Sequence, residues 1–173
     1  RVVQAASGTA GNSRTFQNSD SAQLYGLEAD GRFEFALGGS YDQTFFVAFN
    51  AAFIESKVTA HNEARRALQG QPEYTANLIL GYDSLSAGHQ LTVLLNQNGK
   101  SIADVGVSGQ SDVFMEPRLD LNVVYRFDFS DELSLKAKLD NLLDDEVKYT
   151  QGGQIFQMYN RGPTLQFGLD WQF

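Results

Sequence analysis

The stretch 164–173 reads Thr-Leu-Gln-Phe-Gly-Leu-Asp-Trp-Gln-Phe and alternates without a break between polar and apolar side chains. Every second position, beginning with Leu165, is large and apolar, whereas the positions between are polar or glycine. Successive side chains of a β-strand point to opposite faces. The stretch therefore predicts a strand with one apolar face and one polar face.

The same alternation recurs upstream and predicts an all-β chain. We expect seven strands, near residues 15–35, 44–58, 73–82, 90–104, 114–128, 132–149 and 163–173. A stub at 1–5 resembles the end of an eighth strand that the start of the chain cuts off. No segment shows a convincing helical period.

The connections between these strands alternate in length. Short ones are expected near 37–43, 83–89 and 129–131, and longer ones near 6–13, 58–72, 105–113 and 151–162. Outer-membrane barrels have short periplasmic turns and longer external loops. The pattern favours an antiparallel segment of a transmembrane β-barrel whose last strand runs toward the periplasm.

A soluble β-sandwich is the alternative, because its strands also alternate. Three features favour the barrel. Several strands exceed the usual length of about 5–6 residues, and the polar faces carry mixed charge along whole strands. Aromatic residues also gather near strand ends, where interfacial girdles need them. They are Tyr25, Tyr82, Tyr125, Phe127, Trp171 and Phe173.

The composition excludes several classes of protein. With 42% hydrophobic and 12% aromatic residues, the chain is too apolar to be disordered. A formal net charge of -8 argues against nucleic acid as a partner, because phosphates are repelled. Without cysteine, there is no disulfide and no thiolate metal site. The most apolar stretch, 45–54, has about half the length of a spanning helix.

Short motifs, taken in their order along the chain, resemble one family. They are R-V-V-Q at 1–4, N-S-D-S-A at 18–22 with Y-G-L-E at 25–28, L-Q-G-Q-P-E-Y at 68–74 with Asn77 and Y-D at 82–83, N-L-L-D at 141–144 with Tyr149, and R-G-P at 161–163. The set resembles the C-terminal third of a TonB-dependent receptor, an active transporter of the outer membrane. The ending departs from the family in having Arg161 and Gly162 in reversed order.

The resemblance implies a barrel of about 22 strands, plugged by an N-terminal domain, in the outer membrane of a Gram-negative bacterium. Such a transporter binds and imports a scarce nutrient with energy from TonB. Residues 1–173 would then supply barrel wall, external loops and the closing strand, without the plug. The implied partners are the remaining barrel and plug, membrane lipid, the barrel-assembly machinery, TonB through the plug region and a small nutrient. The alternative is a complete small barrel with a structural or adhesive role, because eight strands can close.

The long loops contain the candidate ligand-binding residues. Arg65 and Arg66 suit an anionic ligand, because guanidinium binds carboxylate or phosphate bidentately. His61 lies beside them. The alternative is a solvated loop or contact with acidic surface sugars. The last long loop is polar and aromatic, a mixture that suits ligand contact or simple exposure to solvent. Its candidates are Gln154, Gln157, Tyr159, Asn160 and Arg161.

The apolar face of the last strand is the candidate assembly signal. It consists of Phe167, Leu169, Trp171 and the terminal Phe173. An exposed strand edge with an apolar stripe can pair with another strand. The resemblance implies recognition of this strand by barrel-assembly machinery, and the same residues would also face lipid.

No catalytic cluster is evident, so we expect no enzyme and no cofactor. The two histidines, His61 and His89, are expected in loops at opposite ends of the barrel. Carboxylates at Asp140, Asp144, Asp145 and Glu146 offer hard oxygens to Ca²⁺ but lack the spacing of an EF-hand loop. We therefore predict no metal site there.

Overall fold

The structure is a computed structural model that describes residues 2–7, 11–16, 18–39, 41–59, 65–107 and 109–172. Within these ranges every regular element is a β-strand. The strands are β1 Val2–Ser7, β2 Gly11–Phe16, β3 Ser21–Leu37, β4 Gln43–Thr59, β5 Tyr74–Ser84, β6 His89–Asn98, β7 Ser101–Gly106, β8 Val113–Met115, β9 Arg118–Asp128, β10 Leu133–Asp140, β11 Val147–Gln151, β12 Gln154–Tyr159 and β13 Thr164–Trp171. The described residues contain no helix of the length and apolarity needed to span a membrane.

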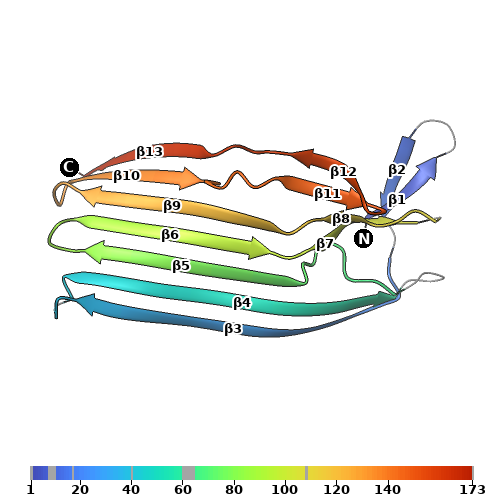
Figure 1. Ribbon diagram of the computed structural model, residues 1–173, viewed down its shortest axis with the longest axis horizontal. Coiled ribbons are helices and arrows are strands. Elements are labelled where there is room, and N and C mark those ends of the chain that lie inside the picture. Colours follow the sequence, from blue (N-terminus) through green and yellow to red (C-terminus); the bar gives the residue numbers. More distant parts are fainter. Residues whose placement is uncertain are drawn as a thin grey trace.

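Seven strands form one antiparallel sheet in the order β13-β10-β9-β6-β5-β4-β3 (Figure 1). Each strand turns back beside the one before it, as in a meander. The β3–β4, β5–β6 and β9–β10 connections are tight and lie together at one end, here called the turn end. The predicted antiparallel all-β chain and its three short connections are confirmed.

A six-stranded sheet in the order β12-β11-β8-β7-β1-β2 lies at the opposite end, here called the far end. Its central strands continue those of the first sheet after a bend. Gly99 and Lys100 separate β6 from β7, and Glu116 and Pro117 separate β8 from β9. Proline has no N–H to donate to a ladder, so Pro117 suits a break between strands. The predicted strands 90–104 and 114–128 are each divided in two.

The predicted strand 132–149 is also interrupted, at the N-L-L-D motif. Strand β10 ends at Asp140 and β11 begins at Val147. Between them Asn141 and Asp144 have φ angles of 56° and 47°. Apart from glycine, which has no Cβ, and asparagine and aspartate, residues rarely adopt this left-handed region. The motif therefore forms a tight bend, and continuous alternation through it was the wrong expectation.

The expected long loop at 151–162 is wrong, because it contains β12. Gly152 and Gly153, with φ angles of 58° and 82°, form the turn that folds β12 back on β11. Two consecutive positive φ angles match the primed turn of a tight hairpin. A register shift at Tyr149 and Thr150, and the adjacent apolar pair Ile155 and Phe156, break the alternation that would have revealed this strand.

The N-terminal stub is a strand, but it belongs to the far-end sheet. Strand β1 pairs antiparallel with β2 and parallel with β7. The predicted strand 15–35 accordingly divides into β2 and the longer β3. In the described part of the chain, β1 with β7 is the one parallel pair.

The chain forms a single-layered wall and not a sandwich. Among the described residues, strands make extensive contacts only with their hydrogen-bonded neighbours. The accessible surface is 11068 Å², whereas a compact monomer of this size exposes about 8,400 Å². The small core lies in the far-end sheet around Ile102 and Val105, which are 3% and 1% exposed. The seven-stranded sheet is not closed, so β3 and β13 are open edges.

Candidate functional site

The pairing register brings the apolar positions of seven strands onto one face of the wall, here called the outer face. One row across the sheet consists of Phe167, Ala137, Tyr125, Leu91, Tyr82, Phe45 and Phe35. The next row consists of Leu165, Leu139, Val123, Val93, Leu80, Val47 and Phe33. A one-residue slip between any two strands would break this band.

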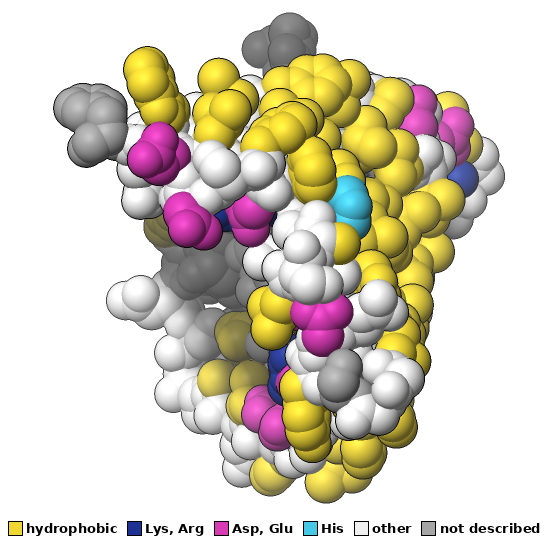
Figure 2. Space-filling model, turned by 90° about the vertical axis from the view of Figure 1, so that its left-hand side faces the viewer, with side chains coloured by type: hydrophobic (Ala, Val, Ile, Leu, Met, Phe, Trp, Pro, Cys, Tyr) yellow, Lys and Arg dark blue, Asp and Glu magenta, His cyan; other side chains and the backbone are white. Residues whose placement is uncertain are grey.

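The outer face is exposed. Leu27 is 73% exposed, Phe167 70% and Trp171 69%. Figure 2 views the wall from the turn end and shows hydrophobic side chains gathered along one side, with a hollow on the other. Monomeric soluble proteins seldom expose an apolar patch beyond a few hundred Å². The outer face therefore exposes more apolar surface than a monomeric soluble protein usually does.

Aromatic residues pack against each other on the outer face. Phe33 stacks on Phe49 with ring centroids 6.4 Å apart. Near the turn end, His89 stacks on Phe127 at 4.6 Å, and its Nδ1 lies 2.8 Å from the hydroxyl of Tyr125. His89 thus belongs to an aromatic cluster at the margin of the apolar band. The expectation that it is a solvated loop residue is wrong.

The opposite face, here called the inner face, has paired charges. Arg126 Nε lies 2.7 Å from Asp128 Oδ1, and Lys138 Nζ lies 3.0 Å from Asp140 Oδ1. Residues two apart on a strand share a face, so these ion pairs run along single strands. Partly exposed pairs of this kind contribute little to stability. These ion pairs keep the inner face hydrated, and their opposite charges largely cancel.

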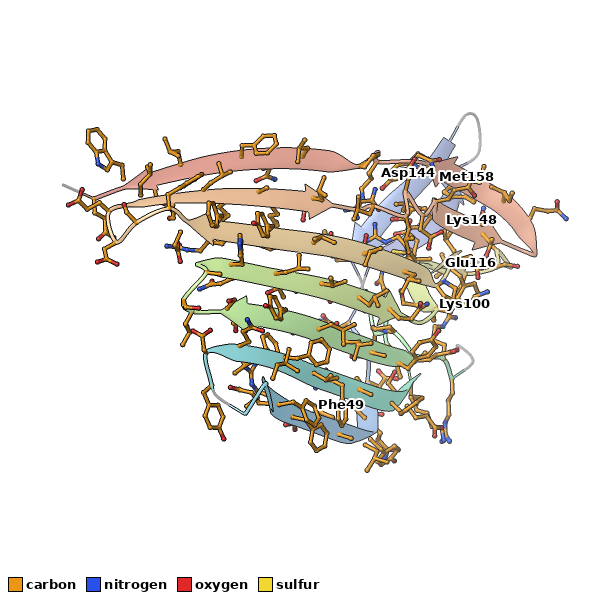
Figure 3. The ribbon with its side chains drawn as sticks, turned by 60° about the vertical axis from the view of Figure 1, so that its left-hand side comes forward. Phe49, Lys100, Glu116, Asp144, Lys148 and Met158 are labelled. Atoms are coloured by element: carbon orange, nitrogen blue, oxygen red, sulfur yellow. The ribbon has the colours of Figure 1, made fainter. Side chains whose placement is uncertain are left out.

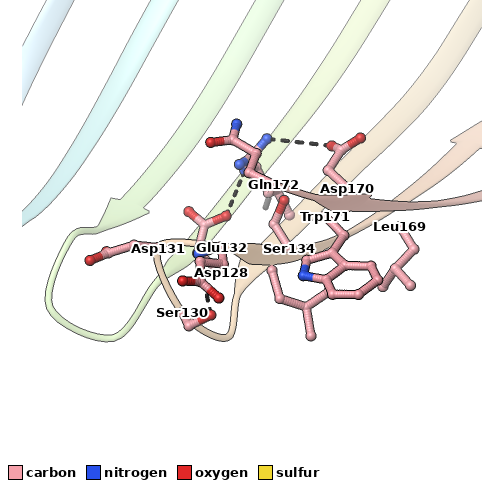
Figure 4. A pocket seen from close by; sticks show the side chains of 11 residues that line it. Asp128, Ser130, Asp131, Glu132, Ser134, Leu169, Asp170, Trp171 and Gln172 are labelled. Carbon is pink, nitrogen blue, oxygen red and sulfur yellow. Dashed lines mark hydrogen bonds and ion pairs between the residues drawn. The ribbon is translucent and has the colours of Figure 1, made fainter.

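The edge strand β13 has the candidate assembly residues on its outer side. Phe167, Leu169 and Trp171 are exposed. Figure 4 shows Leu169 and Trp171 on one side of β13 and Asp170 and Gln172 on the other. Phe173 lies outside the described residues. The backbone of β13 pairs with β10 on one side, and its other side is an unpaired edge.

A pocket of about 530 Å³ lies at the turn end, between the β9–β10 hairpin and the end of β13 (Figure 4). Its polar lining includes Asp128, Glu132 and Asp170 around Arg126. Arg126 Nη1 lies 3.8 Å from Asp170 Oδ2. The arginine already has carboxylate neighbours on two strands. The pocket is therefore better explained as the place where Arg126 links β9 to β13 than as a binding site for an anion.

At the far end, Arg66 is engaged within the chain. Its Nη1 donates to Asp112 Oδ1 at 2.5 Å and to the carbonyl of Gly106 at 3.2 Å. Both side chains are 17% exposed. Asp112 also accepts from the backbone N–H of Gly106 at 2.8 Å. Arg66 therefore holds two loops together, and the two arginines do not share one role. Arg65 is exposed, and His61 lies outside the described residues.

The other loop candidates divide into two groups. Gln154, Gln157 and Tyr159 lie on β12, an exposed edge of the far-end sheet. Asn160 and Arg161 lie at the bend that leads into β13. Asn160 Nδ2 donates to Asp144 O at 3.0 Å, and Arg161 Nη2 lies 3.4 Å from Asp120 Oδ1.

The acidic residues of the bend accept hydrogen bonds from the chain itself. Asp144 Oδ1 accepts from the N–H of Gly162 at 3.0 Å, and Asp145 Oδ2 accepts from the N–H of Leu119 at 2.8 Å. Asn141 Nδ2 donates to the carbonyl of Gly162 at 2.9 Å. These carboxylates stabilise the bend. Across the described ranges, no group of three or more His, Cys, Asp or Glu side chains is placed to hold a metal ion.

One polar cluster at the far end was not predicted. Lys100 Nζ donates to Glu116 Oε1 at 2.8 Å, and Thr150 Oγ1 donates to the same oxygen at 2.5 Å. Figure 3 shows Lys100, Glu116 and Lys148 together at this end. The hydrogen bond from Lys100, followed by that from Thr150, lowers the pKa of Glu116 below its ordinary value. The cluster joins the β6–β7 and β8–β9 breaks to β11, so sequence patterns give no sign of it.

No protein-family model, curated protein or solved structure matches the chain.

Proposed function

We propose that this chain is a section of an outer-membrane β-barrel wall. The carrying observation is the uninterrupted apolar band on the outer face, opposite a charged inner face, between two open sheet edges. A lipid bilayer is the apolar phase that such a face fits. Backbone groups in lipid have no water to bond, so each open edge would need a further strand.

The length of the band agrees with this proposal. Transmembrane strands need about 9–11 residues, and β5 and β9 have 11 residues each. The far-end sheet continues beyond the band, as external loops with structure of their own would. The turn end, with its tight connections and aromatic margin, then faces the periplasm.

Within this class, a TonB-dependent transporter of a scarce nutrient is the function we propose. This proposal is supported by the order of the motifs in the sequence and by the structural role of one of them. The N-L-L-D motif makes the bend between β10 and β11 through the left-handed Asn141 and Asp144. Strand β13 would supply the closing edge, and its apolar side would serve assembly as well as lipid contact.

Site-directed fluorescence tests the wall. The chain has no cysteine, so bimane can be attached to Phe167→Cys on the outer face or Gln166→Cys on the inner face. Any cysteine elsewhere in the full-length gene product is first replaced. In vesicles of lipids brominated on their acyl chains, we expect strong quenching at 167 and little at 166. Equal quenching at both positions would rule out a wall with one lipid-facing side.

Cross-linking in cells tests the transporter. Formaldehyde should join the full-length gene product to TonB, and the cross-link should disappear when the TonB gene is deleted. If the product inserts in the membrane and never cross-links to TonB, the proposal of a barrel wall stands and the proposal of a transporter is refuted. That outcome would favour a structural or adhesive barrel.

A further inference from the structure

One row of the inner face consists of carboxamides and carboxylates on five neighbouring strands. The pairing register aligns Asp120, Asn96, Asn77, Asn50 and Asp30 side by side. We call these five residues the amide row. Neighbouring strands lie about 4.8 Å apart, so the row presents regularly spaced polar groups along a line across the wall.

The amide row is exposed in this chain. Asn50 and Asp30 are exposed, and Asn77 and Asn96 are partly exposed. Asn77 Nδ2 donates to Asn50 Oδ1 at 3.2 Å. The Asn96 amide makes no side-chain hydrogen bond within the described part of the chain. Each amide has two donors and a two-lone-pair acceptor, so most of the row's hydrogen-bonding capacity is unused.

The charges in and beside the row cancel, because Arg118, Arg161 and Lys138 are matched by Asp120, Asp140 and Asp30. Asp120 is paired with Arg118 and lies 3.4 Å from Arg161, and Lys138, two rows nearer the turn end, pairs with Asp140. A pocket of about 330 Å³ lies there, lined by Asp120, Asn122, Asp140 and Arg161 among others. Balanced charge favours a neutral ligand over an anion or a cation, because a charged ligand would be repelled by one member of each pair.

An apolar strip lies beside the amide row on its turn-end side. It consists of Leu94, Ile79 and Ala48, which are themselves aligned across three strands. All three are partly exposed. A ligand lying across the strands would therefore meet C–H groups on one flank and amides on the other. A site that combines apolar contact with a few placed polar groups is typical of small-molecule binding.

We propose that the amide row and its apolar strip bind a neutral carbohydrate on the inner face of the wall. A pyranose ring has an apolar C–H face and hydroxyl groups that both donate and accept, which matches this arrangement. An extended peptide would instead need pockets for alternate side chains. The inference rests on the proposed function, since the inner face is taken to line the route of the transported nutrient.

The test is calorimetric titration of the full-length gene product in detergent with maltotriose, cellotriose and xylotriose. Trigalacturonate and trialanine serve as charged and peptide probes. We expect at least one neutral trisaccharide to bind. The double variant Asn77→Leu, Asn96→Leu should bind it about tenfold more weakly or worse, because two amides lose their hydrogen bonds.

Gln97→Leu is the matched control, because Gln97 follows Asn96 on the same strand and lies on the outer face. Its affinity for the trisaccharide should equal that of the unmodified protein. The proposal is overturned if no neutral trisaccharide binds, if only trigalacturonate or trialanine binds, or if the double variant keeps full affinity. Bimane quenching at 167 reports on the wall separately, so loss of sugar binding in a correctly inserted protein refutes the carbohydrate site alone.

Discussion

The backbone of Gly81 lies directly beneath the ring of Phe46, on the inner face of two paired strands. A Cβ at Gly81 would overlap the Cε1 and Cζ atoms of that ring. The guanidinium of Arg32 lies over the same ring, with its Cζ 3.9 Å from the ring centroid. The glycine therefore provides the space that the ring occupies.

Gly81→Ala should destabilise the wall by about 1–3 kcal/mol, because the ring must move and an overpacked contact costs this much. The free energy of unfolding in urea, measured in detergent with the full-length gene product, reports the change. Gly168→Ala is the control, since its Cβ would lie 3.9 Å from that of Lys136, an ordinary contact. An equal loss in both variants would show that the ring contact is unimportant.

Leu121→Arg should destabilise the membrane-inserted protein by about 2–4 kcal/mol if position 121 lies near the midplane of the bilayer. The physical reason is the transfer of a guanidinium into hydrocarbon. Asn122→Arg, one residue along β9 and on the inner face, should cost much less. Refolding equilibria into lipid vesicles measure both. Similar costs would indicate that the two faces meet the same medium.

Glu116→Gln should weaken the dependence of thermal stability on pH at acid pH, here called the acid limb of the stability curve. The folded-state pKa of Glu116 is lowered, so its contribution is fully present above the ordinary glutamate pKa of about 4.3 and is lost as the pH falls through the lower folded value. Glutamine keeps an acceptor for Lys100 and Thr150 but does not titrate. Thermal unfolding from pH 6 downward measures the slope.

The control for that experiment is Glu146→Gln, whose carboxylate lies 3.7 Å from Lys148 and is 44% exposed. Because a partly exposed ion pair contributes little to stability, Glu146→Gln should change the thermal stability less than Glu116→Gln does. An unchanged limb in Glu116→Gln would mean that the cluster at Lys100 does not contribute to acid stability.

Arg66→Ala should destabilise the far-end sheet, because it leaves Asp112 partly buried with one fewer donor. The loss should lie between that of an exposed pair, about 0–1 kcal/mol, and that of a buried pair, about 3–5 kcal/mol. Arg65→Ala, next to it and exposed, should be silent. Protease cleavage after folding, read at residues 106–112, reports local opening. Equal cleavage of both variants would contradict the inference that Arg66 and Asp112 hold their two loops together.

The sequence predicts the wall well because its signal is local. Alternation from Leu165 onward depends on neighbouring residues only, and it sets both the strand and its two faces. The bend at Asn141 and Asp144 is harder, since positive φ interrupts the strand while polar and apolar residues still alternate nearby. Strand β12 was missed because Ile155 and Phe156 are adjacent.

The candidate sites depend on distant pairings and were less predictable. Arg66 and Asp112 are 46 residues apart, and nothing in either loop indicates that they meet. The amide row likewise needs the register of five strands, which no single strand specifies. In the sequence, Asn77 and Asn96 are ordinary inner-face residues, and only the pairing of β5 with β6 shows that they lie side by side. The position of Phe167 and Trp171 on one face of β13, in contrast, follows from alternation alone.

The breaks at Gly99–Lys100, Glu116–Pro117 and Asn141–Glu146 form a boundary line across the protein. On the turn-end side of this line, long hydrogen-bond ladders fix the register of the strands, and a change at one position shifts a whole strand. On the far-end side, the hairpins are tied to one another, because Arg66 joins Asp112 and β8 pairs with β11. These segments can therefore be exchanged only together. A chimera with a join at every break would carry new surface chemistry on the same scaffold, which gives both evolution and protein engineers one replaceable unit.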